Sequence, residues 1–307
     1  MIKGGLFLLK KKLSVGDKYG YYGYFFIAPF FIVLAIFSAY PMLYSLGLSF
    51  FEWDGTARPA TFVGGKNFIA LLSDETFRDA ILNTWILWLV NVIPQMIFGL
   101  LMAIILTDEK IRAKGFFRGV FYLPNLITMS SVGALFYFIM DWQSGSLNQI
   151  LMNLHIIDEP FNWLQDIFAT RTSVSAILTW MWFGYTMIIF MAGIKAIPTE
   201  LFEAGYVDGT TKWQSFRYIT LPSIKPTMLY QIVTSLIGGM TLFDIPNVLT
   251  GGNGEPQGSI LTMVMYLYNM AFKSNYFGYA ATIGVGLFLI ILIFVVLAFK
   301  LLKADVD

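Results

Sequence analysis

The sequence contains no cysteine, a single histidine and few charged residues among its 307 positions. Without cysteine the chain can form neither a disulfide nor a thiolate metal site, and thiol catalysis is excluded. The one histidine, His155, cannot make a metal site by itself. Charged residues make up 13% of the chain, whereas a soluble domain carries roughly a quarter. Hydrophobic residues, at 57%, dominate what is left.

A nucleotide-binding phosphate loop is also missing from the sequence. The motif requires G-x-x-x-x-G-K-[ST], and the only Gly-Lys pair, Gly65-Lys66, is followed by Asn67. The Gly-rich residues 251–254 resemble such a loop only superficially, because no strand is expected before them. We therefore expect this chain to catalyse no reaction and to bind no cofactor, so that any energy source lies on another protein. We expect no nucleic-acid partner.

Long uncharged runs are the main feature that is present. Six segments lack Asp, Glu, Lys and Arg, and each is long enough, the fifth only just, for the roughly 20 apolar residues of a membrane-spanning helix. The sequence therefore predicts an all-α, polytopic membrane protein with one integral domain over residues 1–307. The expected spans are about 21–50, 82–106, 117–140, 172–194, 226–244 and 275–299.

The basic residues are distributed unevenly between these runs. If the N-terminus is cytoplasmic, fifteen of the 20 Lys and Arg residues fall in inside segments and five fall outside. Lys and Arg are enriched on the cytoplasmic side of membranes, so we expect both termini to be cytoplasmic. The five outside residues are Arg58, Lys66, Arg78, Arg171 and Lys273.

The inner segment between the fourth and fifth spans, residues 198–222, has a helical pattern of its own. Thr199 is expected to cap a helix, and Glu203 lies near the start of that helix, where a carboxylate is stabilised. Gly209 follows Asp208 and is expected to end the helix, because glycine tolerates the left-handed conformation. A loop that only connects two spans would not need this pattern.

A second short helix is expected after the bend. Thr210 or Thr211 can cap it, and Pro222 is expected to end it. The two helices would then present an apolar side either to another cytoplasmic protein or to the lipid head groups. The apolar residues concerned are Phe202, Trp213 and Phe216.

The same segment resembles the EAA motif of permease subunits in ABC-type importers. Glu203-Ala204-Gly205 is followed after three residues by Gly209, and after nine more by Ile219-x-Leu221-Pro222. Gly205 stands where the family usually has a second alanine, which exchanges one small residue for another. Further likeness to sugar importers, in particular to maltose-transporter-type permeases, extends from about residue 24 to residue 290. It is carried by FIAPF (26–30), YPMLYSLGLSF (40–50), FFRGVFYLP (116–124), KAIP (195–198) and VLTGG (248–252).

The resemblance implies a type I ABC importer permease in a bacterial or archaeal cytoplasmic membrane. A second permease subunit would complete the path, and an extracellular solute-binding protein would deliver a carbohydrate, with oligosaccharides favoured. The 198–222 segment would be the coupling helix, docked on a cytoplasmic ATPase dimer that holds ATP and Mg. Its coupling residues would be Glu203, Ala204, Gly205, Asp208, Gly209, Ile219, Leu221 and Pro222.

The resemblance also implies which residues line the sugar path. Neutral polar and aromatic side chains suit a sugar, which offers hydroxyl groups and C–H faces and needs no opposite charge. Ordinary packing is the alternative explanation, because small residues let membrane helices approach closely. The implied positions are Trp182 and Tyr185 in the fourth span, with Ser235, Gly238, Gly239 and Leu242 in the fifth.

Two other functions are open: the main alternative is an ion-coupled secondary carrier, and the other is a non-transporting membrane scaffold. The positions of the acidic residues test the first of these. Such carriers place ionisable groups inside spans, at a cost of roughly 2.5–3.5 kcal/mol each. Asp79, Asp141 and Asp244 fall at outer ends instead, which favours the importer. Three amides inside the second span are expected to bond to neighbouring helices rather than to substrate. They are Asn83, Asn91 and Gln95.

Overall fold

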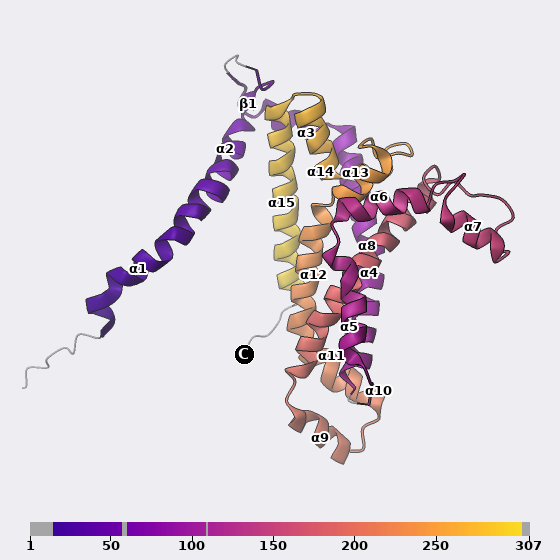
Figure 1. Cartoon of the computed structure of the whole chain (residues 1–307). Coiled ribbons are helices and arrows are strands. Elements are labelled where there is room, and N and C mark those ends of the chain that lie inside the picture. Colours follow the sequence, from indigo (N-terminus) through magenta and orange to yellow (C-terminus); the bar gives the residue numbers. More distant parts are fainter. Residues whose placement is uncertain (1–14, 57–59, 109, 303–307) are drawn as a thin grey trace, which may run out of the picture. The chain divides into compact units, whose positions relative to one another are not determined.

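The computed structural model describes residues 15–56, 60–108 and 110–302. It separates into two units, the first ending at Leu48 and the second beginning at Ser49, and each is described by itself. Most of the described chain is helical, as Figure 1 shows. The all-α prediction is thus confirmed, with one short pair of strands as an addition.

The first unit is one run of helix with a change of geometry inside it. It comprises α1 (Val15–Leu34), the π-helical turn η1 (Ala35–Ala39) and α2 (Tyr40–Leu48). Pro41 has no backbone N–H and cannot close an α-helical bond, and just before it the Tyr40 N–H donates to the Ala35 carbonyl. The turn lies directly before Pro41, and a proline inside a helix commonly bends it. Residues Tyr22–Leu48 are long and apolar enough to cross a membrane.

The second unit begins with a small hairpin that the sequence did not predict. Strands β1 (Phe51–Glu52) and β2 (Thr61–Phe62) pair antiparallel. They are followed by the short helix α3 (Lys66–Leu72). Strands of two residues are too short to show an alternating pattern, so periodicity could not reveal them.

Four long helices form the body of the second unit. The helices α4 (Glu75–Thr107) and α8 (Ile167–Lys195) pack against each other, and α12 (Lys225–Met240) contacts both of them. On its other side α12 lies beside α15 (Phe277–Leu302), as Figure 1 shows. Small residues permit this closeness: a Cβ atom on Gly99 of α4 would lie only 2.7 Å from the Thr186 side chain of α8.

The third apolar run, for which the sequence predicts a span over residues 117–140, is broken by a sharp bend. Helix α5 (Lys114–Tyr122) and the 3-10 turn η2 (Leu123–Leu126) are bent by 92° from α6 (Met129–Ile139). Pro124 lies within η2, and the Thr128 hydroxyl caps α6 by accepting a bond from the Ser131 N–H at 3.3 Å. The sequence contains both signals, but the length of the apolar run concealed the break.

Shorter helices lie between the long ones. On the expected outer side, α14 packs against α4 and α15, while α13 packs against α6. The short elements are α7 (Ser146–Asn153), α9 (Thr199–Val207), α10 (Lys212–Ser215), η3 (Phe216–Thr220), α11 (Leu221–Ser223), α13 (Asp244–Thr250), α14 (Met263–Tyr268) and η4 (Asn269–Lys273).

The described helices support the predicted number of membrane crossings. Five of them are long and apolar enough to span, and the bent pair α5–α6 makes a sixth if it counts as one span. The fifth expected span, residues 226–244, is extended by α13, so that Lys225–Thr250 passes the same test as a unit.

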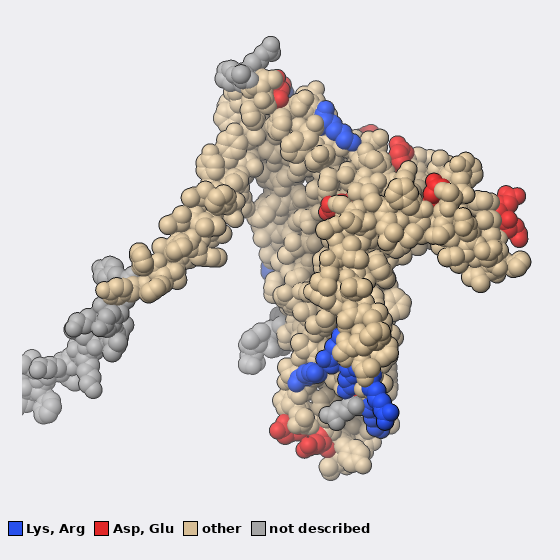
Figure 2. Space-filling view, in the orientation of Figure 1, with Lys and Arg blue, Asp and Glu red and all other residues tan. Residues whose placement is uncertain are grey.

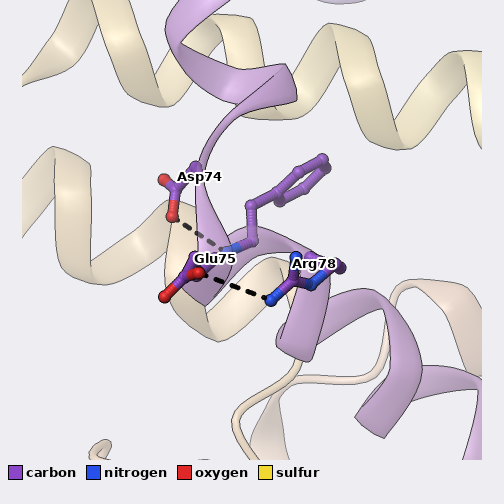
Figure 3. Close-up of polar contacts among 4 residues, drawn as sticks. Asp74, Glu75 and Arg78 are labelled. Carbon is purple, nitrogen blue, oxygen red and sulfur yellow. Dashed lines mark hydrogen bonds and ion pairs between the residues drawn. The ribbon is translucent and has the colours of Figure 1, made fainter.

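The outer end of α4 is held by an aspartate. Asp74 caps the helix through Oδ1, which accepts a bond from the Phe77 N–H at 3.1 Å (Figure 3). Its Oδ2 accepts bonds from the hydroxyls of Tyr266 and Tyr279, both at 2.5 Å. Partial burial opposes ionisation, but these bonds outweigh it and lower the pKa of Asp74. The neighbouring Glu75–Arg78 pair, also in Figure 3, is exposed at 3.7 Å and adds little.

The Gly-rich outer loop before α14 is pinned to the helix bundle. Asn83 donates to the carbonyls of Gly258 and Leu261 at 2.8 and 3.3 Å. Arg171 of α8 donates to the Ser259 carbonyl at 3.0 Å and to Asn83 Oδ1 at 2.6 Å. Asn83 therefore bonds away from its own helix, as the sequence analysis expected of amides in this span.

Candidate functional site

A cavity of about 270 Å³ lies between α4, α8 and α12. Its wall combines aromatic rings, amides, hydroxyls and glycines, and none of the described residues that line it carries a charge. The lining residues are Trp88, Asn91, Gln95, Met129, Leu178, Trp182, Tyr185, Gln231, Thr234, Ser235, Gly238, Gly239 and Leu242.

All six positions implied by the resemblance lie in this one wall. Trp182 and Tyr185 come from α8, whereas Ser235, Gly238, Gly239 and Leu242 come from α12 and the residues just after it. Their gathering is what a shared ligand-lining role requires, and the role itself stays a prediction. The wall also contains residues that the sequence did not assign to it, chiefly Trp88 and Gln231.

Two of the small residues in α12 have different surroundings. A Cβ atom on Gly239 would lie 2.2 Å from Cδ1 of Trp88, so only glycine fits against that ring. Trp88 also donates from Nε1 to the Ser235 hydroxyl at 3.2 Å. In contrast, a Cβ atom on Gly238 would meet nothing within 4 Å. Gly239 therefore serves helix packing as well as the cavity, which is the alternative that the sequence left open.

A chain of hydrogen bonds crosses three helices beside the cavity. Thr186 Oγ1 accepts from Gln95 Nε2 at 2.8 Å and from Gln231 Nε2 at 2.9 Å. Asn91 Nδ2 donates to Gln95 Oε1 at 3.4 Å, and the Thr179 hydroxyl donates to Asn91 Oδ1 at 3.1 Å. Gln95 and Asn91 thus bond to a neighbouring helix as predicted, although both also line the cavity.

The 198–222 segment folds as a helix, a tight bend and a second helix. Helix α9 ends at Val207, and Gly209 follows with φ of +72°, which confirms the glycine stop. The Thr211 hydroxyl caps α10, and Gln214 completes a capping box. Gly205 is buried, and a Cβ atom there would lie 2.9 Å from the Ile219 Cδ1 atom.

Two details of this segment differ from the prediction. Thr199 is the first residue of α9, and Pro198 occupies the cap position instead. Pro222 does not end the second helix, because α10 continues through η3 into α11. Pro222 has no N–H to donate, and it follows directly on the π-helical turn η3, in which the Leu221 N–H bonds to the Phe216 carbonyl.

The exposed apolar residues of this segment are not those that spacing suggested. Of the predicted set only Trp213 is well exposed, at 69%. Phe202 and Phe216 are half-buried and line a cavity of about 540 Å³ below the ends of α4 and α8. Spacing along a helix cannot tell which face its neighbours will cover. The other exposed residues are Tyr206 and Val207, each at 84%, Tyr218 at 73% and Leu201 at 47%.

Charges around the segment are divided by sign. Figure 2 shows acidic side chains at the tip formed by α9, with basic ones gathered above them near α5 and α10. The Lys110 backbone N–H bonds Asp108 at 3.0 Å and lowers the pKa of that carboxyl, with the ammonium groups of Lys212 and Lys114 adding to the effect. The basic residues match the side that the positive-inside rule assigns to the cytoplasm.

Comparison with known families decides the class of protein. Residues 69–304 match the family described as "Binding-protein-dependent transport system inner membrane component". The chain belongs to this family. It is therefore a multi-pass membrane permease subunit of a transport system, and the resemblance noted in the sequence is confirmed.

Individual relatives are similar over almost their whole length. The lactose transport system permease protein LacF of Rhizobium radiobacter is 35% identical, over 93% of this chain and 94% of LacF. The arabinooligosaccharides transport system permease protein AraP of Bacillus subtilis is 33% identical, over 91% of this chain and 87% of AraP.

A solved structure supports the same fold. It is a bacterial ABC transporter involved in the import of the acidic polysaccharide alginate, and one of its chains superposes with a TM-score of 0.80. The match covers 94% of this chain and 98% of the other at 23% identity. The fold is thus that of a type I ABC importer permease, as expected.

Proposed function

We propose that this permease forms half of the translocation path of an ATP-driven carbohydrate importer. The observation that carries the proposal is the uncharged cavity, whose wall contains all six positions expected to line a sugar path. The names of the lactose and arabinooligosaccharide relatives support a carbohydrate, and oligosaccharides are favoured among carbohydrates.

The cavity has the chemistry that a sugar needs. The rings of Trp182 and Tyr185 meet at 6.0 Å between centroids with an interplanar angle of 88°, and both residues line the wall. Aromatic faces cover the C–H surfaces of a sugar, while amides and hydroxyls bond to its hydroxyl groups. A second, different permease subunit completes the path around this wall.

The cytoplasmic side of the proposal rests on the 198–222 segment. Its exposed rings and acidic tip form a surface that an ATPase subunit can cover, and α9–α11 lie in the chain between α8 and α12. ATP and Mg bind to the ATPase dimer, and this chain hydrolyses nothing. When the dimer closes, the coupling segments move and switch the cavity from inward- to outward-facing. An extracellular solute-binding protein delivers the carbohydrate.

Purification and reconstitution test the proposal. The tagged chain, expressed with the proteins encoded beside it, should co-elute with an ATPase and a second permease. In proteoliposomes this complex should import a neutral oligosaccharide only with ATP and the solute-binding protein. Transport by the chain alone, driven by a proton or sodium gradient, would instead establish the ion-coupled carrier.

A further inference from the structure

An arginine without a partner lies near the cytoplasmic end of the broken third span. Arg118 belongs to α5 and is half-buried. None of the residues that the structure describes accepts a hydrogen bond from its guanidinium or forms an ion pair with it. Its Nε is enclosed without an acceptor, whereas its two terminal nitrogens are not among the enclosed atoms. The charged end of Arg118 is therefore open to a group from outside this chain.

An arginine in a membrane span needs a partner, because its guanidinium stays charged at physiological pH. Removing an unpaired charge from water is costly, so ionisable groups inside spans pair with another group. A carboxylate suits best, since its two oxygens match the fork of guanidinium N–H groups. Asp108 precedes α5 in the chain but interacts with the ammonium groups of Lys212 and Lys110 instead. The described part of this chain thus leaves the carboxylate to another protein.

Arg118 lies on the face of α5 that adjoins the cavity wall. The end of α5 abuts α8 there: a Cβ atom on Gly184 would lie 1.9 Å from the Phe121 carbonyl oxygen and 3.0 Å from the Tyr122 nitrogen. The Tyr122 hydroxyl is also within electrostatic reach of that of Tyr185, which lines the cavity. Arg118 comes one helical turn before Tyr122, so the two side chains share a face. That face continues the wall toward the cytoplasm.

The opposite face of α5 is apolar and exposed. Phe116 and Val120 each lie two positions from Arg118, about 200° around the helix, and are 68% and 46% exposed. Such side chains suit lipid. A lipid phosphate is consequently a poorer match for Arg118 than a protein group on the cavity side.

Two glycines beside Arg118 leave room for another helix. Gly115 and Gly119 are exposed, and a Cβ atom on either would meet nothing within 4 Å. Small residues four positions apart let a membrane helix of another chain approach closely. A carboxylate on such a helix can reach the Arg118 guanidinium.

We propose that Arg118 forms an ion pair with an Asp or Glu side chain of the second permease subunit, between the cavity and the cytoplasm. This inference rests on the proposed path formed by two permeases. The pair joins the two halves of the path on the cytoplasmic side of the cavity.

The first experiment identifies what lies against this face. The photoreactive residue p-benzoylphenylalanine, introduced at Gly119 and irradiated in membranes that hold the complete transporter, should form an adduct with the second permease subunit. The same probe at Phe116 is the control and should react with lipid. An adduct of the Gly119 probe with phospholipid or with the ATPase would overturn the proposal. Failure of the wild-type chain to co-purify with any second permease would instead contradict the proposed function.

The second experiment measures the association of the two permeases on dilution of the purified complex. Arg118→Glu places like charges together and should raise the dissociation constant at least about tenfold, whereas Arg118→Lys keeps the charge and should raise it less. Arg112→Gln is the matched control, because it removes an exposed positive charge from the same inner segment.

A charge exchange then tests the pair itself. In the Arg118→Glu background, arginine in place of the carboxylate found by the adduct should restore association, which also shows that the variant folds. An unchanged dissociation constant in Arg118→Glu, or no restoration by the exchange, would contradict the proposal.

Discussion

The cavity wall and the 198–222 segment differ in how far their side chains are exposed. In and directly behind the wall, Gln95, Thr186 and Gln231 are buried, and both glutamines donate to the Thr186 hydroxyl across helices. In the segment, Tyr206 and Val207 are 84% exposed at the tip of a helix. The difference agrees with the proposal that a small ligand enters the wall and that another protein covers the segment.

The two regions are also joined by the chain itself. The cavity takes residues from α8 and α12, and α9–α11 form the only stretch between these helices. A displacement of the segment therefore acts on both α8 and α12, the two helices that it joins and that both line the cavity. A substitution within one region is expected to spare the packing of the other.

Gly209→Val should abolish transport. Gly209 has φ of +72°, which a β-branched residue adopts only with strain, although no atom lies near its Cβ position. We expect normal membrane levels and an uptake reduced to background, with the ATPase either lost or no longer stimulated by the binding protein. Gly209→Asn is the control and should retain much of the uptake, because asparagine tolerates the left-handed conformation. Normal uptake by the valine variant would remove the coupling role of the segment.

Gly239→Ala should damage the wall. The new methyl group would lie 2.2 Å from the Trp88 ring, and such overpacking costs about 1–3 kcal/mol of folding free energy. Gly238→Ala meets no atom within 4 Å and should leave stability nearly unchanged. The thermal unfolding midpoints of the two purified variants measure the contrast. Equal midpoints would show that the close approach of α12 to Trp88 is unimportant.

Tyr185→Ala should weaken transport while leaving the complex assembled. Loss of one buried hydrogen bond costs about 0.5–1.5 kcal/mol, which corresponds to a decrease of up to roughly tenfold in affinity for the sugar. The half-buried ring lies in the wall and outside the coupling segment, residues 198–222. Stimulation of the ATPase by the binding protein should therefore persist. Full transport would exclude Tyr185 from the sugar path.

Asp74→Asn should have the smallest effect on transport, and it should cost about 0.5–1.5 kcal/mol of folding free energy at neutral pH. Hydrogen bonds from Tyr266 and Tyr279 hold the pKa of Asp74 below its ordinary value. The stabilisation is therefore complete above about pH 4 and is lost as the pH falls through the lowered pKa. Thermal unfolding against pH should show the wild type and the variant converging in that acidic range. A difference that persists at the lowest pH would contradict this origin.

Features set by neighbouring residues could be predicted from the sequence, whereas features set by contacts between distant helices could not. Gly209 and Thr211 specify their bend and cap through neighbours in the chain; the sequence predicts the bend and offers Thr210 or Thr211 as the cap. The place of Gln231 in the wall depends on its contact with Thr186, 45 positions earlier, and no local pattern marks it. The break at Pro124 was signalled by residue type but hidden in an apolar run. The six wall positions were found only through the family resemblance.

The central claim is that ATP acts through the coupling segment to change access to the cavity. The chain has no cysteine, so Ser235→Cys provides a single thiol in the wall, within a complex whose partner subunits are freed of cysteine. An impermeant maleimide applied from outside should label it faster when ATP is present. Gly254→Cys should label from outside in every state, and Ser215→Cys in none. Adding Gly209→Val to Ser235→Cys should abolish the ATP effect. Labelling of the wall thiol that is independent of ATP, or an ATP effect that survives Gly209→Val, would contradict the account.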